Sequence, residues 1–255
     1  MRGGYLGGMC MSKQPIINLP YSDINGFNVA WASNTTLTVT SGLCRDSTNV
    51  FDLKTTATKT IDAAVNGVNG LDTGSFAASK CYAIHVIGDS SGFNSTGVLL
   101  SLSDTAPTMP DGYDIFRRVG WAMSDGSTHF ILIYQSGIGS VRSYTYDEPV
   151  SVLSGGSSAT FAAVALTEKV PAVNNLQVFL AADFTPNAAN DVAYLRSGGS
   201  SATNGITFKG SVAAKISSCV VPVVAKLVTA APTIEYKVTA SGALTALLVS
   251  FVDYI

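Results

Sequence analysis

The residues Gly88–Gly92 match the G-x-S-x-G pattern, the sharp turn that presents the nucleophile of a serine hydrolase. They follow an apolar run, as that motif requires, but residues 93–97 (FNSTG) are typical of a loop and not of the helix that should come next. The serine would also need a histidine oriented by an acid, and the chain has only His85 and His129. His85 lies within the apolar run, and His129 lies beside a predicted turn. We expect no catalytic residues, and a hydrolase acting through Ser90 stays as a remote alternative.

Several aspartates lie close together in the first half of the chain. Paired carboxylates can cleave glycosides, and a D-x-D-x-D-G spacing binds calcium, but that spacing is missing from the sequence. Aspartate is also favoured in turns, where its side chain accepts backbone hydrogen bonds. We interpret four residues as turn residues: Asp104, Asp111, Asp114 and Asp125.

The cysteines are too scattered for a zinc site, because they form no C-x-x-C pair and have no histidine nearby. We predict four buried thiols in a protein that folds in a reducing cytoplasm, namely Cys10, Cys44, Cys81 and Cys219. We expect no metal and no cofactor.

One stretch combines aromatic and basic residues. We take five of its members as candidates for contacts across a subunit boundary: Tyr113, Phe116, Arg117, Arg118 and Trp121. The alternative is that one arginine is exposed while the other pairs with Asp114 or Asp111. We interpret Trp31 and Trp121 as packing residues and not as sugar platforms.

The composition argues for assembly. Apolar residues make up 47% of the chain and charged residues only 13%, about half of what a soluble domain usually carries. We expect much of the surface to be buried against other subunits. The net charge of −2 and the absence of any basic run predict no nucleic-acid partner and no attachment to a membrane. No apolar run reaches the length of a membrane helix, and no secretory signal is expected.

The elements that would position these residues are strands. Short β-rich runs bounded by Gly, Asn, Asp, Ser or Pro are typical of a β-sandwich. They occur at Thr36–Thr40, Val50–Leu53, Tyr82–Ile87, Gly97–Leu102, Val119–Met123, Phe130–Tyr134, Thr160–Leu166, Leu176–Ala181, Val192–Leu195, Ile206–Phe208, Val220–Val228, Ile234–Val238 and Leu244–Val252. The pair Asp125-Gly126 predicts a hairpin between two of these runs.

We predict an all-β chain of two β-sandwich, jelly-roll-like domains preceded by an extended N-terminal arm. The arm spans 1–26, the first domain 27–148 and the second 149–255. The boundary is placed at Tyr146–Ser158, where Asp147-Glu148-Pro149 interrupts the strand pattern and a Ser/Gly run follows. The heptad SGGSSAT occurs at Ser154–Thr160 and again at Ser197–Thr203, which we interpret as two similar polar loops.

Three stretches carry a resemblance to a known class of proteins: Leu43–Asn49, Tyr82–Ser90 and Pro107–Trp121. With a strand that ends in Gly-Asp-Ser, then Met-Pro-Asp-Gly-Tyr, then Arg-Arg-Val-Gly and a hairpin, residues 40–145 resemble a module of tailed-bacteriophage virion proteins. Members of this class are described as tail-fibre or minor structural proteins. The chain departs from the usual string at Met109 and Val119, where leucine and isoleucine are common.

The resemblance implies a non-enzymatic protein of the tail or fibre apparatus, made in the host cytoplasm and carried in the virion. It implies a homotrimer whose partners are other virion proteins, with contact to the host surface. A capsid-decorating protein, of the cement or head-fibre kind, is the alternative, for which the extended arm is the best feature.

Overall fold

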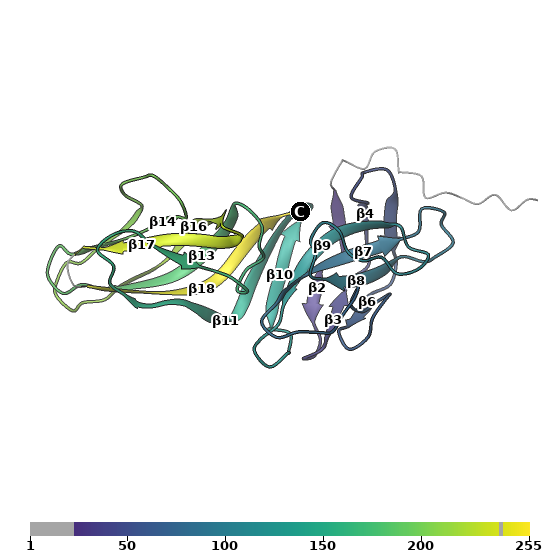
Figure 1. Cartoon of the computed structure of the whole chain (residues 1–255), viewed down its shortest axis with the longest axis horizontal. Coiled ribbons are helices and arrows are strands. Elements are labelled where there is room, and N and C mark those ends of the chain that lie inside the picture. Colours follow the sequence, from purple (N-terminus) through teal and green to yellow (C-terminus); the bar gives the residue numbers. More distant parts are fainter. Residues whose placement is uncertain (1–22, 240–241) are drawn as a thin grey trace, which may run out of the picture.

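The computed structural model describes residues 23–239 and 242–255, which form eighteen β-strands with no helix among them. The predicted all-β, sandwich-like class is therefore confirmed. Two lobes lie end to end (Figure 1), a first lobe of residues 23–132 and a second lobe of residues 133–255. Residues 1–22 of the predicted arm lie outside the described residues, and Ile24–Gly26 form the first strand.

The first lobe contains three antiparallel sheets of three strands, in the orders β1-β4-β5, β2-β3-β6 and β8-β7-β9. The middle strand β7 is buried along almost its whole length, which is why its sequence is a continuous apolar run with no alternation. The strands are β1 (Ile24–Gly26), β2 (Val29–Trp31), β3 (Thr36–Val39), β4 (Gly42–Arg45), β5 (Asp52–Thr55), β6 (Lys59–Asp62), β7 (Cys81–Gly88), β8 (Gly97–Ser101) and β9 (Ile115–Met123).

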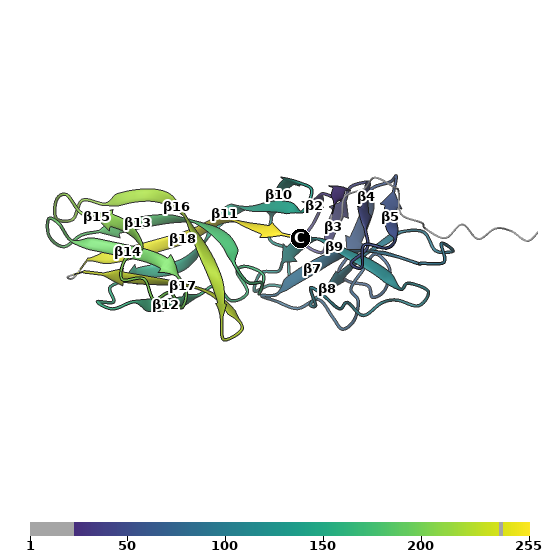
Figure 2. The same cartoon turned by 90° about the horizontal axis from the view of Figure 1, so that it is seen from above.

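The second lobe is one nine-stranded antiparallel sheet with the order β10-β11-β18-β13-β16-β17-β14-β15, and β12 pairs with β17 off this path. Figure 2 shows β13 and β16 along one side of this lobe and β12 and β17 along the other. The strands are β10 (Ile133–Ile138), β11 (Val141–Gly156), β12 (Ala162–Ala165), β13 (Leu176–Thr185), β14 (Val192–Ser197), β15 (Ile206–Lys209), β16 (Ser217–Val228), β17 (Ala231–Val238) and β18 (Ala243–Tyr254).

Alternation along β13 and β18 builds the core of the second lobe. Leu176, Val178, Leu180 and their alternate successors are buried, while the residues between them lie on the outer side of the sheet. The same core cluster includes Trp121 and Met123 of β9, so apolar packing continues from one lobe to the other.

The stretch interpreted as a domain boundary is a strand. β11 runs through it from Val141 to Gly156, and the pairing with β18 jumps between Thr145 and Val150. Asp147-Glu148-Pro149 is accommodated in this irregularity, since a proline has no N–H to give to the ladder and is tolerated at a bulge. Strands β10 and β11 therefore pair within the second sheet, ahead of the expected division at residue 149.

Every strand predicted from the sequence overlaps an observed one, whereas five observed strands were missed: β1, β2, β4, β6 and β11. The two copies of the heptad end β11 and β14 but turn differently. In the first copy the left-handed residue is Gly155, at the second position of the heptad (φ 61°). In the second copy it is Gly199, at the third position (φ 63°). Identical residues thus adopt different turns in different surroundings.

The predicted hairpin forms at residues 125–129, and the Asp125 carboxylate accepts hydrogen bonds from the backbone N–H groups of Ser127 and His129, both at 2.8 Å. The left-handed position is Thr128 (φ 63°), and Gly126 is not at a positive φ. A β-branched residue is strained there. We expect Thr128→Gly to raise the free energy of unfolding by about 1 kcal/mol, measured by chemical denaturation. Ser127→Gly is the control, and a gain from it instead would contradict the assignment.

Candidate assembly surfaces

A buried polar cluster joins the two lobes where β9 meets the end of β18. Asp253 forms an ion pair with Arg118 and accepts a hydrogen bond from the Trp121 indole N–H at 2.7 Å. The Arg118 guanidinium also lies over the Trp121 ring, 4.7 Å from its centroid. Only 14% of the Arg118 side chain and 6% of the Asp253 side chain are exposed. Losing any member of this cluster would leave another buried polar group without its partner.

The structure places three of the five predicted interface residues at this junction within one chain. Besides Arg118 and Trp121, Arg117 donates a hydrogen bond from Nη2 to the backbone oxygen of Ile255 at 3.3 Å. Phe116 packs edge-on against His85, and the Tyr113 hydroxyl donates to the backbone oxygen of Ser95 at 3.1 Å. The sequence alternative that paired an arginine with Asp111 or Asp114 is wrong in its partner, because Arg118 pairs with Asp253.

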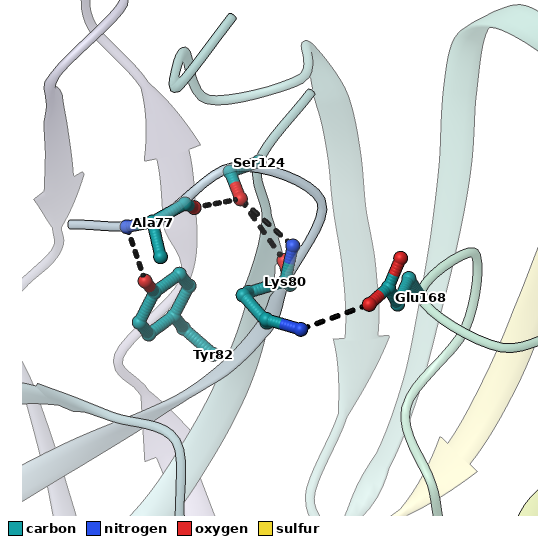
Figure 3. A network of polar contacts seen from close by, with 5 residues as sticks. All are labelled: Ala77, Lys80, Tyr82, Ser124 and Glu168. Carbon is teal, nitrogen blue, oxygen red and sulfur yellow. Dashed lines mark hydrogen bonds and ion pairs between the residues drawn. The ribbon is translucent and has the colours of Figure 1, made fainter. Parts of the chain in front are cut away.

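A second link between the lobes is exposed. The Lys80 ammonium group and the Glu168 carboxylate form an ion pair at 2.9 Å, next to the loop that Ser124 and Tyr82 hold in place (Figure 3). The Ser124 hydroxyl donates to the backbone oxygen of Ala77, and the Tyr82 hydroxyl accepts from its N–H. The hydrogen bond to Glu168 raises the pKa of Lys80 above its ordinary value. Beside this pair lies an open cleft of about 310 Å³ that is lined by both lobes.

A third link places a buried arginine of β11 against the first lobe. Arg142 donates from Nη1 to the Asn28 side-chain oxygen at 2.7 Å and from Nη2 to the backbone oxygen of Gly26 at 2.9 Å. The neighbouring strand adds Gln135, whose side-chain oxygen accepts from the backbone N–H of Val29. Nothing in the sequence indicated this arrangement, since Arg142 is 114 residues from Asn28.

The G-x-S-x-G residues form a turn stabilised by two aspartates. The Ser90 hydroxyl and backbone N–H both donate to the Asp114 carboxylate, while Asp89 accepts hydrogen bonds from the backbone N–H groups of Ser91, Phe93 and Asn94. Within residues 23–239 and 242–255, no hydrogen bond joins Ser90 to a histidine, and β8 follows the turn where a hydrolase would have a helix. This geometry provides a structural use for the motif, which is the capping of a turn.

His85 is buried in β7, and its Nε2 lies 3.0 Å from the backbone oxygen of Ser103. Burial lowers the pKa of His85 to about 4, and the nearby Arg118 charge acts in the same direction, against the hydrogen bond to Ser103. Between pH 6.5 and 4 the unfolded chain binds a proton that the folded chain excludes. Stability is therefore full above pH 6.5 and decreases as the pH falls.

We expect the free energy of unfolding to decrease by about 2 kcal/mol between pH 7.5 and pH 5 because of His85. Chemical denaturation at the two pH values measures the loss, which His85→Leu should remove and His129→Gln should leave in place. An unchanged loss in His85→Leu would show that other groups cause it.

The cysteines differ in exposure. Cys44 is buried and Cys81 partly buried, and burial raises the pKa of both thiols to about 12. Cys219, on β16, is exposed, so the prediction of a buried thiol is wrong there. Cys10 lies outside the described residues. None of the described cysteines belongs to a group of metal-binding side chains.

Large apolar side chains are exposed at fifteen positions of the described chain, and six of them lie on β16 or in the loop before it. The six are Val212, Ile216, Val220, Val224, Leu227 and Val228. Exposed apolar residues scattered singly are ordinary, but a local group of this kind is typical of a binding surface.

Strand β16 is part of a wider surface that we name the β13 face. It consists of sixteen outward residues of β11, β18, β13 and β16. Fifteen lie opposite one another in the ladder, and Lys226 follows the last pair of β16 with β13: Ser143, Thr145, Ser151, Gln177, Phe179, Ala181, Asp183, Ser218, Val220, Pro222, Val224, Lys226, Thr245, Leu247, Ser250 and Val252. Seven of these residues are apolar and seven are uncharged polar residues. Asp183 and Lys226 are the charged ones among these sixteen, and the exposed Asp147 and Glu148 lie beside them in the irregular part of β11, at the edge of the face.

A group of three charged residues, Arg196, Glu235 and Lys237, lies on β14 and β17. Arg196 and Glu235 form an ion pair at 2.6 Å, and Arg196 and Lys237 both lie over the ring of Phe161. Two surfaces of one lobe thus differ in character. The charged β14–β17 surface is favourable for exposure to solvent, whereas the β13 face is favourable for contact with another protein surface.

No helix of the described residues is long and apolar enough to cross a membrane.

Comparisons with known proteins do not assign the chain to a family. No protein-family model and no curated protein sequence matches the chain. Among solved structures the chain is similar to the tryptic core of a Bacillus thuringiensis Cry1Da variant, with a TM-score of 0.19 and 7% identity over 92% of this chain and 51% of that one. The chain spans about half the length of that structure, and a TM-score this low carries no argument about fold or function.

Proposed function

We propose that this chain is a non-enzymatic structural subunit of a tailed-bacteriophage particle, located in its tail or fibre apparatus. The observation that supports the assembly role best is the β13 face, where an exposed sheet surface carries two charges among sixteen residues. A chain with 13% charged residues gains solubility when such a surface is covered by another subunit. The assignment to a phage particle rests on the resemblance of residues 40–145 to virion modules.

The virion resemblance also leads us to propose a homotrimer that contacts other virion proteins. The interlobe junction supports a structural role for the residues of that module, because Arg118 and Trp121 hold the C-terminal strand in place. A structural subunit of this kind holds its neighbours in place by rigid packing and needs no reactive group.

Quantitative mass spectrometry of purified particles from a host that carries the gene tests the proposal. We expect the chain in the particles at tens of copies or fewer, as for tail parts. Hundreds of copies would favour a capsid-decorating protein, and absence from the particles would contradict a virion role. Labelling of Ser90 by a fluorophosphonate probe, lost in Ser90→Ala, would contradict the non-enzymatic assignment.

A further inference from the structure

We propose that the β13 face binds the same face of a second copy of this chain, with the strands of the two copies antiparallel about a two-fold axis. The inference rests on one part of the proposed function, that the chain assembles with copies of itself. It adds which surface is used, in which orientation, and with which partner.

The positions of the two charges indicate how the two copies are oriented relative to each other. Asp183 lies opposite Ser218 on β16, and Lys226 lies eight residues further along that strand, which places the two charges about 26 Å apart at 3.3 Å per residue. Both side chains are exposed, and within the described residues neither forms a hydrogen bond or an ion pair. Along β13 and β16, one end of the face is therefore negative and the other positive.

A two-fold axis across the middle of the strands brings opposite charges together. The midpoint between Ser218 and Lys226 is Pro222, which lies opposite Phe179. Rotation about that point places Lys226 of each copy next to Asp183 of the other, so that two ion pairs form at the ends of one contact. Parallel stacking of the strands would instead put like charges together.

The apolar residues lie where such a contact needs them. Phe179 and Pro222 occupy the centre of the face, and Val220 and Leu247 flank Ala181, their common neighbour in the ladder. An apolar centre with charges at the rim is the usual anatomy of a protein interface. Sheets that pack face to face also keep their strands within about 30° of each other, which the antiparallel arrangement allows.

The area of the face is sufficient for a specific contact. Four strands spaced about 4.8 Å apart, over about 26 Å of length, give about 500 Å² for each copy, or about 1,000 Å² in total. Specific interfaces begin at about this size, so we expect a reversible dimer through this face alone. A face that pairs with itself is fully used by one partner. Three-fold association must therefore use a different surface.

Charge reversal tests the orientation. In Asp183→Lys every self-contact places lysine against Lys226, and in Lys226→Asp every self-contact places aspartate against Asp183, so each variant alone should dimerise at least about tenfold more weakly than the wild type. In an equal mixture of the two variants both ion pairs are restored, one between the native Lys226 and the native Asp183 and the other between the two substituted positions with its charges exchanged. We expect the mixture to form a heterodimer with an affinity within about threefold of the wild type, measured by sedimentation velocity with one variant fluorescently labelled.

Two further variants separate the apolar contact from general effects. Val220→Asp, on the β13 face, should abolish the dimer, whereas Val65→Asp, at an exposed valine of the first lobe, should leave it unchanged. A mixture that stays as weak as the single variants would overturn the two-fold arrangement, and so would a dimer that Val220→Asp leaves intact. If the chain forms a trimer whose affinity none of the four substitutions changes, this inference is overturned but the proposed function stands. If the chain forms the two-fold dimer in solution but is absent from purified particles, this inference stands and the proposed function is overturned.

Discussion

Asp253→Ala is expected to lower the free energy of unfolding by about 3–5 kcal/mol, because it removes one partner of a buried ion pair. The Asp253 carboxylate is the partner of both the Arg118 guanidinium and the Trp121 indole N–H. With the carboxylate gone, a buried charge and a buried donor are left unpaired at the contact between the lobes. Denaturation in urea, followed by tryptophan fluorescence, measures the loss.

The exposed link between the lobes is the matched control for that experiment. Glu168→Gln removes the ion pair with Lys80, whose two side chains are each 43% exposed, and we expect no measurable loss of stability. Asp253→Asn should fall between the two, since it keeps an acceptor for Trp121 but loses the charge that faces Arg118. If Asp253→Ala cost no more than Glu168→Gln, the buried cluster would not hold the lobes together.

Phe251→Ala is expected to lower the free energy of unfolding by a similar amount, about 3–5 kcal/mol, because it removes a fully buried ring from the core of the second lobe. The Phe251 ring is fully buried and stacks on Tyr144, with 4.6 Å between the ring centroids and 13° between the planes. Tyr146, two residues further along β11, lies with its ring centroid 6.2 Å from that of Phe251. Two aromatic neighbours therefore lose their packing partner, and they are held too rigidly on β11 to fill the space.

The same substitution at an exposed phenylalanine provides the comparison. Phe93 is 83% exposed in the loop after β7, and only its backbone N–H contacts Asp89, so Phe93→Ala should change the free energy of unfolding by less than about 0.5 kcal/mol. Thermal unfolding of both variants side by side measures the difference. Equal effects would contradict the placement of Phe251 in the core.

The strands were predictable where burial leaves a pattern in the sequence. Tyr82–Ile87 is apolar throughout because β7 is covered on both sides, and Leu176–Ala181 alternates because one side of β13 faces the core. The missed strands β1 and β2 have three residues each, too few for any periodicity. β11 was missed in part because Asp147-Glu148-Pro149 resembles a linker, although a bulge can hold such residues inside a strand.

The candidate surfaces were less predictable, because they depend on residues distant in sequence. The sequence singled out Arg118 and Trp121 as candidates for contacts across a subunit boundary, but their partner Asp253 lies in the same chain, more than 130 residues away. The β13 face combines residues of four strands whose order in the sheet does not follow the chain. Composition indicated that such a surface should exist, and only the pairing of the strands located it.

The mass of the full-length chain in solution tests the central claim most directly. Sedimentation equilibrium over the whole range of soluble concentrations should give a mass that rises above 26.4 kDa toward two or more times that value. Full association at high concentration would agree with a sheet surface that copies of the chain cover for one another. A constant mass of 26.4 kDa up to the limit of solubility would contradict it.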